Sequence, residues 1–253
     1  MPLWLTACVW GLAIGSGLFL GAMIAFHFAF SHLQIATVMG FGGGVLVVVL
    51  STGLMEEAYH YGGFIYTTLG FIGGGALFST VNWLLSKRGA QHRKRCGECV
   101  GQPSETEVRG SGLAIAVGSI MDAIPEAFVV GLNLVGGASI GKAVLAGFFI
   151  ANIPQGLSSA SGMKEAGRSG FYILGVWSSI FLLSGATALF GFSVFNNASP
   201  QAIASSNAFA AGAILAMLAE TMIPEAFQKS HNFMGLITGC GFIFFFLLTK
   251  MLS

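Results

Sequence analysis

Three segments of the sequence combine a proline with carboxylate or carboxamide side chains inside otherwise apolar stretches. The segments are residues 121–126 (MDAIPE), 151–156 (ANIPQG) and 220–225 (ETMIPE). A carboxylate at the centre of a membrane costs roughly 2.5–3.5 kcal/mol on insertion scales, so such residues usually face a polar pathway. A proline inside a helix frees the carbonyl oxygen four residues earlier, and that oxygen is tolerated only where protein or a water-filled cavity surrounds it. The three segments therefore indicate a cation-binding pathway through a membrane.

The candidate metal ligands of this pathway are oxygen atoms. Asp122 and Glu126 are four residues apart and so share one face of a helix. Asn152 and Gln155 are three residues apart and flank the second proline, and Glu220 stands four residues before the third. Carboxylate, amide and backbone oxygens that converge at depth bind hard or borderline metal ions. The alternative for each acid is a hydrogen bond that stabilises packing between helices.

Three further residues are weaker candidates for the same pathway. Ser51 offers a hydroxyl oxygen, although a hydroxyl bonded back to the preceding turn is an equally good interpretation. Glu57 lies at the outer end of its helix, where acids concentrate cations at an entrance, and the alternative is a solvated helix end. Glu225 lies near the cytoplasmic end of its helix, where it could relay ions to the exit.

A basic loop at residues 87–110 contains His92, Cys96 and Cys99 in an H-x3-C-x2-C spacing. The C-x2-C pair is a common half-site for zinc, but a tetrahedral site needs a fourth ligand that the loop does not plainly offer. Arginine and lysine residues lie between His92 and Cys96, so a mobile basic loop is the alternative interpretation.

The composition is typical of a membrane protein. Hydrophobic residues make up 55% of the chain and charged residues only 8%, whereas charged residues make up about a quarter of a soluble domain. Apolar runs of about 20 residues, each long enough to cross a bilayer, recur along the chain. We therefore predict a single all-α transmembrane domain over residues 1–253 with eight spans. The predicted spans are 3–26, 34–58, 61–86, 111–134, 140–163, 169–192, 201–226 and 231–252.

The cationic side chains orient this predicted bundle. With eight spans, nine of the 11 lysines and arginines fall in loops on one side, and Lys142 and Lys250 fall on the other. The positive-inside rule then places the 87–110 loop in the cytoplasm and both termini outside. We expect an integral protein of the plasma (inner) membrane.

Two pairs of helices have similar sequences. When Gly44 is aligned with Gly212, the second and seventh spans match without gaps, and the fourth and fifth spans match around Pro125 and Pro154. The helices of each pair run in opposite directions in an eight-span chain. Inverted repeats of this kind form midplane sites in transporters.

These residues resemble the ZIP (Zrt/Irt-like) family of divalent metal transporters over essentially the whole chain. The segments that carry the resemblance are 122–131, 152–167 and 219–227. It implies eight spans, proline-bent fourth and fifth helices, and divalent metal ions as substrates, with zinc typical and iron or manganese as other candidates. Asp122 stands where the family has histidine and Gln155 where it usually has glutamate. Without imidazole the ligand set shifts toward oxygen, which suits manganese, magnesium or ferrous iron comparatively better than zinc.

The sequence therefore predicts a permease that moves divalent metal ions toward the cytosol through a midplane carboxylate and amide site. The alternative is a transporter of a small organic cation or metabolite on the same fold with a degenerate metal site. We do not expect an enzyme, because H-E-x-x-H is absent and no serine or cysteine has an evident base beside it. Membrane lipid and metal ions are the expected partners, nucleic acid is not, and a homodimer is left open.

Overall fold

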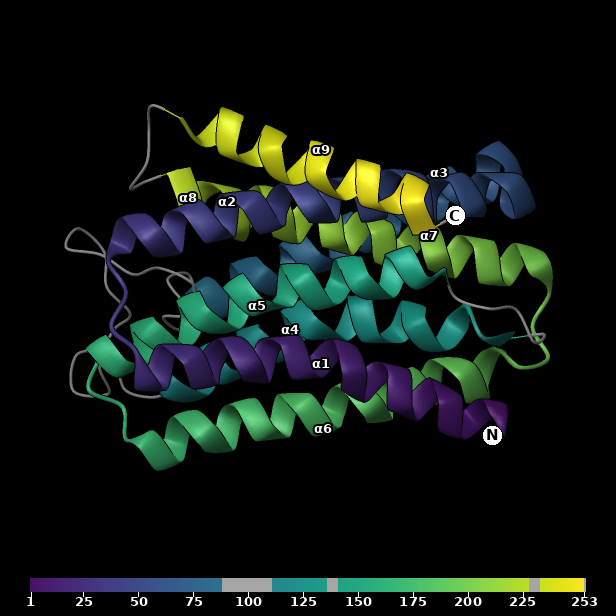
Figure 1. Ribbon diagram of the computed structural model, residues 1–253. Helices are drawn as coiled ribbons and strands as arrows, with labels where there is room; N and C mark the ends of the chain where they lie inside the picture. Colours follow the sequence, from purple (N-terminus) through teal and green to yellow (C-terminus); the bar gives the residue numbers. More distant parts are fainter. Residues whose placement is uncertain (88–110, 136–140, 228–232, 253) are drawn as a thin grey trace.

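All regular secondary structure in the computed structural model is helical over the residues it describes, 1–87, 111–135, 141–227 and 233–252 (Figure 1). The elements are α1 (Leu3–His27), α2 (His32–Val48), the π-helical η1 (Val49–Met55), α3 (Glu56–Ser86), α4 (Ser111–Leu132), α5 (Lys142–Glu165), α6 (Gly170–Phe195), α7 (Pro200–Met217), the π-helical η4 (Leu218–Met222), α8 (Ile223–Phe227) and α9 (Met234–Leu252). The prediction of an all-α chain is confirmed over these ranges.

Seven helical segments of the described ranges are long and apolar enough to cross a membrane. One of them, His32–Ser86, joins α2, η1 and α3 into 55 residues, and a helix of that length is about 80 Å long, more than twice the thickness of a hydrocarbon core. Gly63 interrupts this stretch with φ 61° and ψ −167°, a conformation that glycine adopts far more readily than other residues. The sequence placed the break between the second and third predicted spans at residues 59–60. This position is wrong, because the helix continues to Gly63, where a glycine permits the break.

The chain reverses direction at Gly63. After the reversal α3 runs parallel to α7, as two successive contacts show: a Cβ on Gly70 would overlap the carbonyl oxygen of Ser205, and a Cβ on Gly74 would overlap that of Phe209. Figure 1 shows α7 running opposite to α2, whereas α9 runs alongside α2 in the same direction. The two halves of the 55-residue stretch are thus antiparallel segments of one bundle.

The helices form two bundles that meet along two seams. α1, α4, α5 and α6 pack together, whereas α2 pairs with α9 and α3 pairs with α7. In the first bundle Gly21 meets the backbone of Ile153, and Gly131 meets the backbone of Ala188. Small residues permit this close approach of helix backbones where no larger side chain would fit. The bundles meet where α2 packs on α5 and where α4 packs on α7.

The α2–α9 and α3–α7 pairs use equivalent glycine contacts. A Cβ on Gly44 would overlap the carbonyl oxygen of Thr238 on α9, and a Cβ on Gly212 would overlap the carbonyl oxygen of Phe71 on α3. The reciprocal contacts are Gly241 with Phe41 and Gly74 with Phe209. In the alignment of Gly44 with Gly212, η4 falls on residues 50–54 of η1. The two departures from α-helical geometry therefore lie at matching positions.

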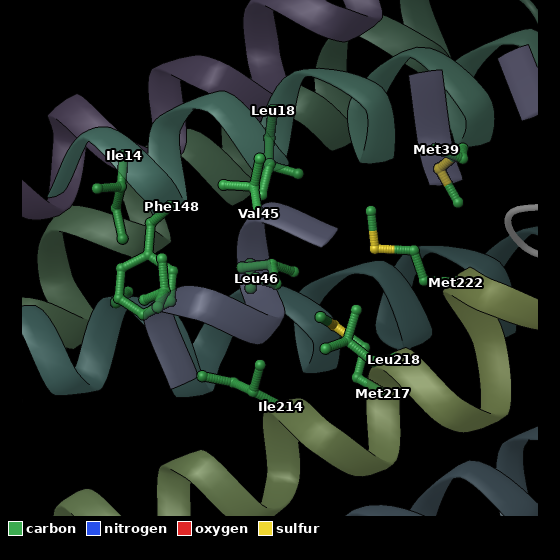
Figure 2. Close-up of a cluster of buried hydrophobic side chains, with 14 of the residues drawn as sticks. Ile14, Leu18, Met39, Val45, Leu46, Phe148, Ile214, Met217, Leu218 and Met222 are labelled. Atoms are coloured by element: carbon green, nitrogen blue, oxygen red, sulfur yellow. The ribbon is translucent and has the colours of Figure 1, made fainter. Parts of the chain in front are cut away.

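Apolar side chains from both bundles share one core. Figure 2 shows Ile14 and Leu18 of α1 and Phe148 of α5 close to Val45 and Leu46 of α2. None of these five side chains is more than 3% exposed. The core therefore joins the two bundles.

Candidate functional site

Four polar side chains of α4 and α5 are buried in the first bundle. Asp122 is 3% exposed, Glu126 is 1% exposed, and Asn152 and Gln155 are each 2% exposed. The Nε2 atom of Gln155 donates hydrogen bonds to Asn152 Oδ1 at 3.2 Å and to Glu126 Oε1 at 3.4 Å. Asp122 lies one helical turn before Glu126 on the same face of α4. We call these four residues the polar cluster.

Contacts with α1 position the cluster. Asn152 Nδ2 donates a hydrogen bond to the carbonyl oxygen of Ile14 at 3.1 Å. The two helices approach closely at Gly17, where an added Cβ would lie 3.1 Å from the Cβ of Asn152. Pro125 and Pro154 lie inside α4 and α5, each of which continues through its proline. Gly17 thus lets α1 approach α5 where the carboxamide of Asn152 meets the carbonyl oxygen of Ile14.

Two buried serines extend the polar surface of the cluster along α4 and α5. Ser119 and Ser159 are 5% and 1% exposed, and their hydroxyl oxygens are 3.4 Å apart. Ser159 was not among the residues predicted from the sequence. It lies four residues after Gln155, a spacing that places both side chains on the same face of α5. The buried polar surface therefore continues from the cluster toward the start of α4 and the end of α5.

Glu220 lies on the side of η4 that faces α3. It is exposed, and it accepts hydrogen bonds from the hydroxyl of Ser79 and from Asn82 Nδ2, the latter at 2.8 Å. These contacts give the Glu220 carboxylate partners on α3, and its predicted role as a ligand beside the acids of α4 stays a prediction. Helical periodicity alone does not account for η4, whose wider π-helical turn changes the face on which a side chain lies.

The hydroxyl of Ser51 is bonded to the preceding turn of its own helix. Its Oγ donates to the carbonyl oxygen of Val47 at 2.8 Å, and the neighbouring Thr52 donates to that of Val48 at 2.9 Å. Both residues are exposed. The structure thus favours the second interpretation of Ser51, a locally satisfied hydroxyl.

Glu57 lines a separate cavity of about 280 Å³ between η1, the start of α5 and the end of α9. Thr52, Thr249 and Lys142 line the same cavity. The ammonium group of Lys142 opposes the attraction that Glu57 would exert on a cation. The cavity therefore attracts a cation less strongly than Glu57 alone would.

The remaining candidates fall elsewhere in the chain. Glu225 is 9% exposed and lies on the short helix α8. His92, Cys96 and Cys99 lie outside the described residues, so the predicted half-site has no structural account.

The chemistry available at the polar cluster follows from its oxygen atoms. Over the described ranges, no three His, Cys, Asp or Glu side chains are grouped closely enough to hold a metal ion. The cluster instead combines two carboxylates with two carboxamides. Oxygen donors of this kind suit hard divalent cations, and they can also accept hydrogen bonds from an organic cation.

In comparisons with known proteins, no family model and no curated protein matches this chain.

Proposed function

We propose that this chain is a membrane permease that moves divalent metal ions of the zinc, iron or manganese class toward the cytosol through the polar cluster. The observation that carries the proposal is the burial of Asp122 and Glu126, at 3% and 1% exposure, within a helix apolar enough to span a membrane. Desolvation of a carboxylate is costly, and ionisable residues inside membrane helices usually serve an ion pathway. A passing cation offsets part of that cost.

The shared hydrogen-bond donor supports a common binding point. Glu126 Oε1 and Asn152 Oδ1 both accept from the same nitrogen of Gln155, at 3.4 and 3.2 Å. Two oxygens from two helices are therefore directed at one position. Metal coordination from facing helices requires this arrangement.

Eight membrane crossings and inverted repeats are part of the proposal. The reversal at Gly63 supports two crossings within the 55-residue stretch. The equivalent backbone contacts of Gly44 and Gly212 and the matching positions of η1 and η4 support a repeat that relates α2 to α7. Both features agree with the resemblance to ZIP transporters, whose proline spacing is matched by Pro125 and Pro154.

The proposed orientation places both termini outside the cytosol. The bond from Lys164 Nζ to the carbonyl oxygen of Phe26, at 3.0 Å, supports a common end of the bundle for the C-termini of α1 and α5. Lys164 and Arg168 lie at this end, and the positive-inside rule assigns it to the cytoplasm.

A second candidate function is transport of a small organic cation. Gln155 directs a hydrogen-bond donor into the cluster, and the described residues include no group of three acids, histidines or cysteines suited to a metal. Both observations favour a ligand that is held by hydrogen bonds as well as by charge.

Uptake by proteoliposomes tests the proposal. The wild-type chain should take up Zn²⁺, Mn²⁺ or Fe²⁺ from the medium, and Asp122→Asn should slow that uptake at least about tenfold, because the carboxylate charge is lost while its size is kept. The matched control is Glu165→Gln, which removes an acid that is 48% exposed at the end of α5, and its uptake should equal that of the wild type. Wild-type uptake by Asp122→Asn would contradict the metal pathway. Uptake of ethanolammonium in place of metal would instead support the second candidate, because its ammonium group can donate hydrogen bonds to the carboxylates and its hydroxyl oxygen can accept one from Gln155.

A further inference from the structure

The orientation of both carboxamides in the polar cluster is determined by one backbone group. The carbonyl oxygen of Ile14 can only accept a hydrogen bond, so Asn152 must present its Nδ2 atom to it, at 3.1 Å. Asn152 Oδ1 then faces Gln155, together with Glu126 Oε1. Because both of these atoms are acceptors, Gln155 must present its Nε2 atom to them.

The Gln155 amide nitrogen therefore lies where two oxygen ligands converge. Its distances to Asn152 Oδ1 and Glu126 Oε1 are 3.2 and 3.4 Å, at or beyond the upper end of the usual range of about 2.7–3.2 Å for such bonds. A divalent metal ion binds oxygen at about 2.0–2.6 Å. A cation that used both oxygens would have to replace this nitrogen.

We propose that Gln155 is an internal competitor of the transported cation and thereby sets its affinity, an inference that rests on the proposed function. The side-chain amide supplies N–H groups to the same oxygens that would coordinate the cation. A half-turn of the amide would put its oxygen in place of the nitrogen, but without a cation the two acceptors Asn152 Oδ1 and Glu126 Oε1 favour the nitrogen at this position. The amide must therefore turn or swing away before a cation can bind both oxygens.

This role is opposite to that of a ligand. A ligand at residue 155 would strengthen cation binding, whereas a competitor weakens it and promotes release. Substitutions that remove or withdraw the amide therefore change the affinity in opposite directions under the two roles.

The test is equilibrium dialysis of Zn²⁺ and Mn²⁺ against the purified full-length protein, with metal quantified by mass spectrometry. Gln155→Met keeps the length of the side chain and removes the donor, and Gln155→Asn keeps the amide but shortens its reach. Both variants should bind the ions about tenfold more tightly than the wild type, which corresponds to the loss of one competing hydrogen bond to a charged acceptor. The matched control, Gln201→Met, alters an exposed glutamine at the start of α7 and should leave the affinity unchanged.

Each alternative outcome has a distinct meaning. Weaker binding in both variants would overturn the inference and make Gln155 a ligand, and unchanged binding would remove residue 155 from the site. Metal binding by the variants alone would support competition by the amide but would contradict metal transport by the wild-type chain. If neither the wild type nor the variants bind metal, the proposed function itself is contradicted. If Gln155→Met does not fold, Gln155→Asn still tests the inference.

Discussion

The two seams between the bundles contain the same kind of residue pair but are packed differently. On the α2–α5 seam, a Cβ on Gly42 would lie 2.8 Å from the Cγ of Pro154. In the proposed repeat, Gly42 corresponds to Ala210 and Pro154 to Pro125, and these two residues line an apolar groove of about 390 Å³ between α3, α4 and α7. Pro154 is therefore packed directly on α2, and we call the α2–α5 seam closed. Pro125 lies beside the apolar groove, and we call the α4–α7 seam open.

This difference shows that similar sequences on two helices need not produce similar packing. A closed seam transmits force between bundles because its atoms are in contact, whereas an apolar groove can change width at little cost. Both prolines belong to the helices that carry the polar cluster. We therefore expect relative movement of the bundles to occur mainly at the α4–α7 seam.

The largest expected effect distinguishes the two seams directly. Gly42→Leu should destabilise the protein by about 3 kcal/mol, because the larger side chain would overlap Pro154 in a packed seam. The equivalent change, Ala210→Leu, should cost less, about 1–2 kcal/mol, because Ala210 is 1% exposed but borders the groove, into which a longer side chain can extend. Thermal unfolding in detergent, followed by tryptophan fluorescence, measures both. Equal losses in the two variants would show that the seams do not differ in packing.

A smaller effect is expected at Gly63, where the chain reverses and α3 runs back beside the α4–α7 seam. Gly63→Ala should destabilise the fold by about 1–3 kcal/mol, the usual cost of a strained backbone conformation. No atom lies within 4 Å of the added Cβ, so the cost would come from the backbone alone. Gly175→Ala on α6 also meets no atom, but Gly175 has an ordinary helical conformation. This control should be neutral or stabilising by about 0.5–1 kcal/mol. The account of the reversal would be wrong if Gly63→Ala were as stable as its control.

The smallest effect is expected in the segment that follows α3 in the sequence and contains Cys96 and Cys99. The double variant Cys96→Ser, Cys99→Ser should transport metal at close to the wild-type rate, because these thiols are not part of the polar cluster. Proteoliposome uptake at equal protein density measures this. Abolished uptake with normal expression would place the loop in the transport path.

The sequence predicted the features that depend on composition and helical spacing. The all-helical chain follows from its long apolar runs, and the partnership of Glu126, Asn152 and Gln155 follows from their spacing around two prolines. The location of Glu220 could not be predicted in the same way. It depends on η4 and on Ser79 and Asn82 of α3, which lie about 140 residues away in the chain.

The sequence predicted a reversal between the second and third spans but placed it at residues 59–60 rather than at Gly63. The neighbouring sequence contains two successive glycines, Gly62 and Gly63, and hydropathy does not indicate which of them departs from the helix. The different packing of the two seams depends on the volume between helices, which local sequence does not specify. Pairwise matches such as Gly44 with Gly212 therefore indicate related elements without determining how tightly each one packs.

In the proposed function, divalent metal ions pass through the polar cluster of α4 and α5 rather than along the α3–α7 side of the molecule. Glu126→Gln and Glu220→Gln make the same chemical change in these two places. Initial rates of Zn²⁺ and Mn²⁺ uptake by proteoliposomes should fall at least about tenfold for Glu126→Gln, because a buried carboxylate oxygen loses its charge, and should change less than about twofold for the exposed Glu220→Gln. Normal uptake by Glu126→Gln together with lost uptake by Glu220→Gln would contradict the account and place the path beside α3.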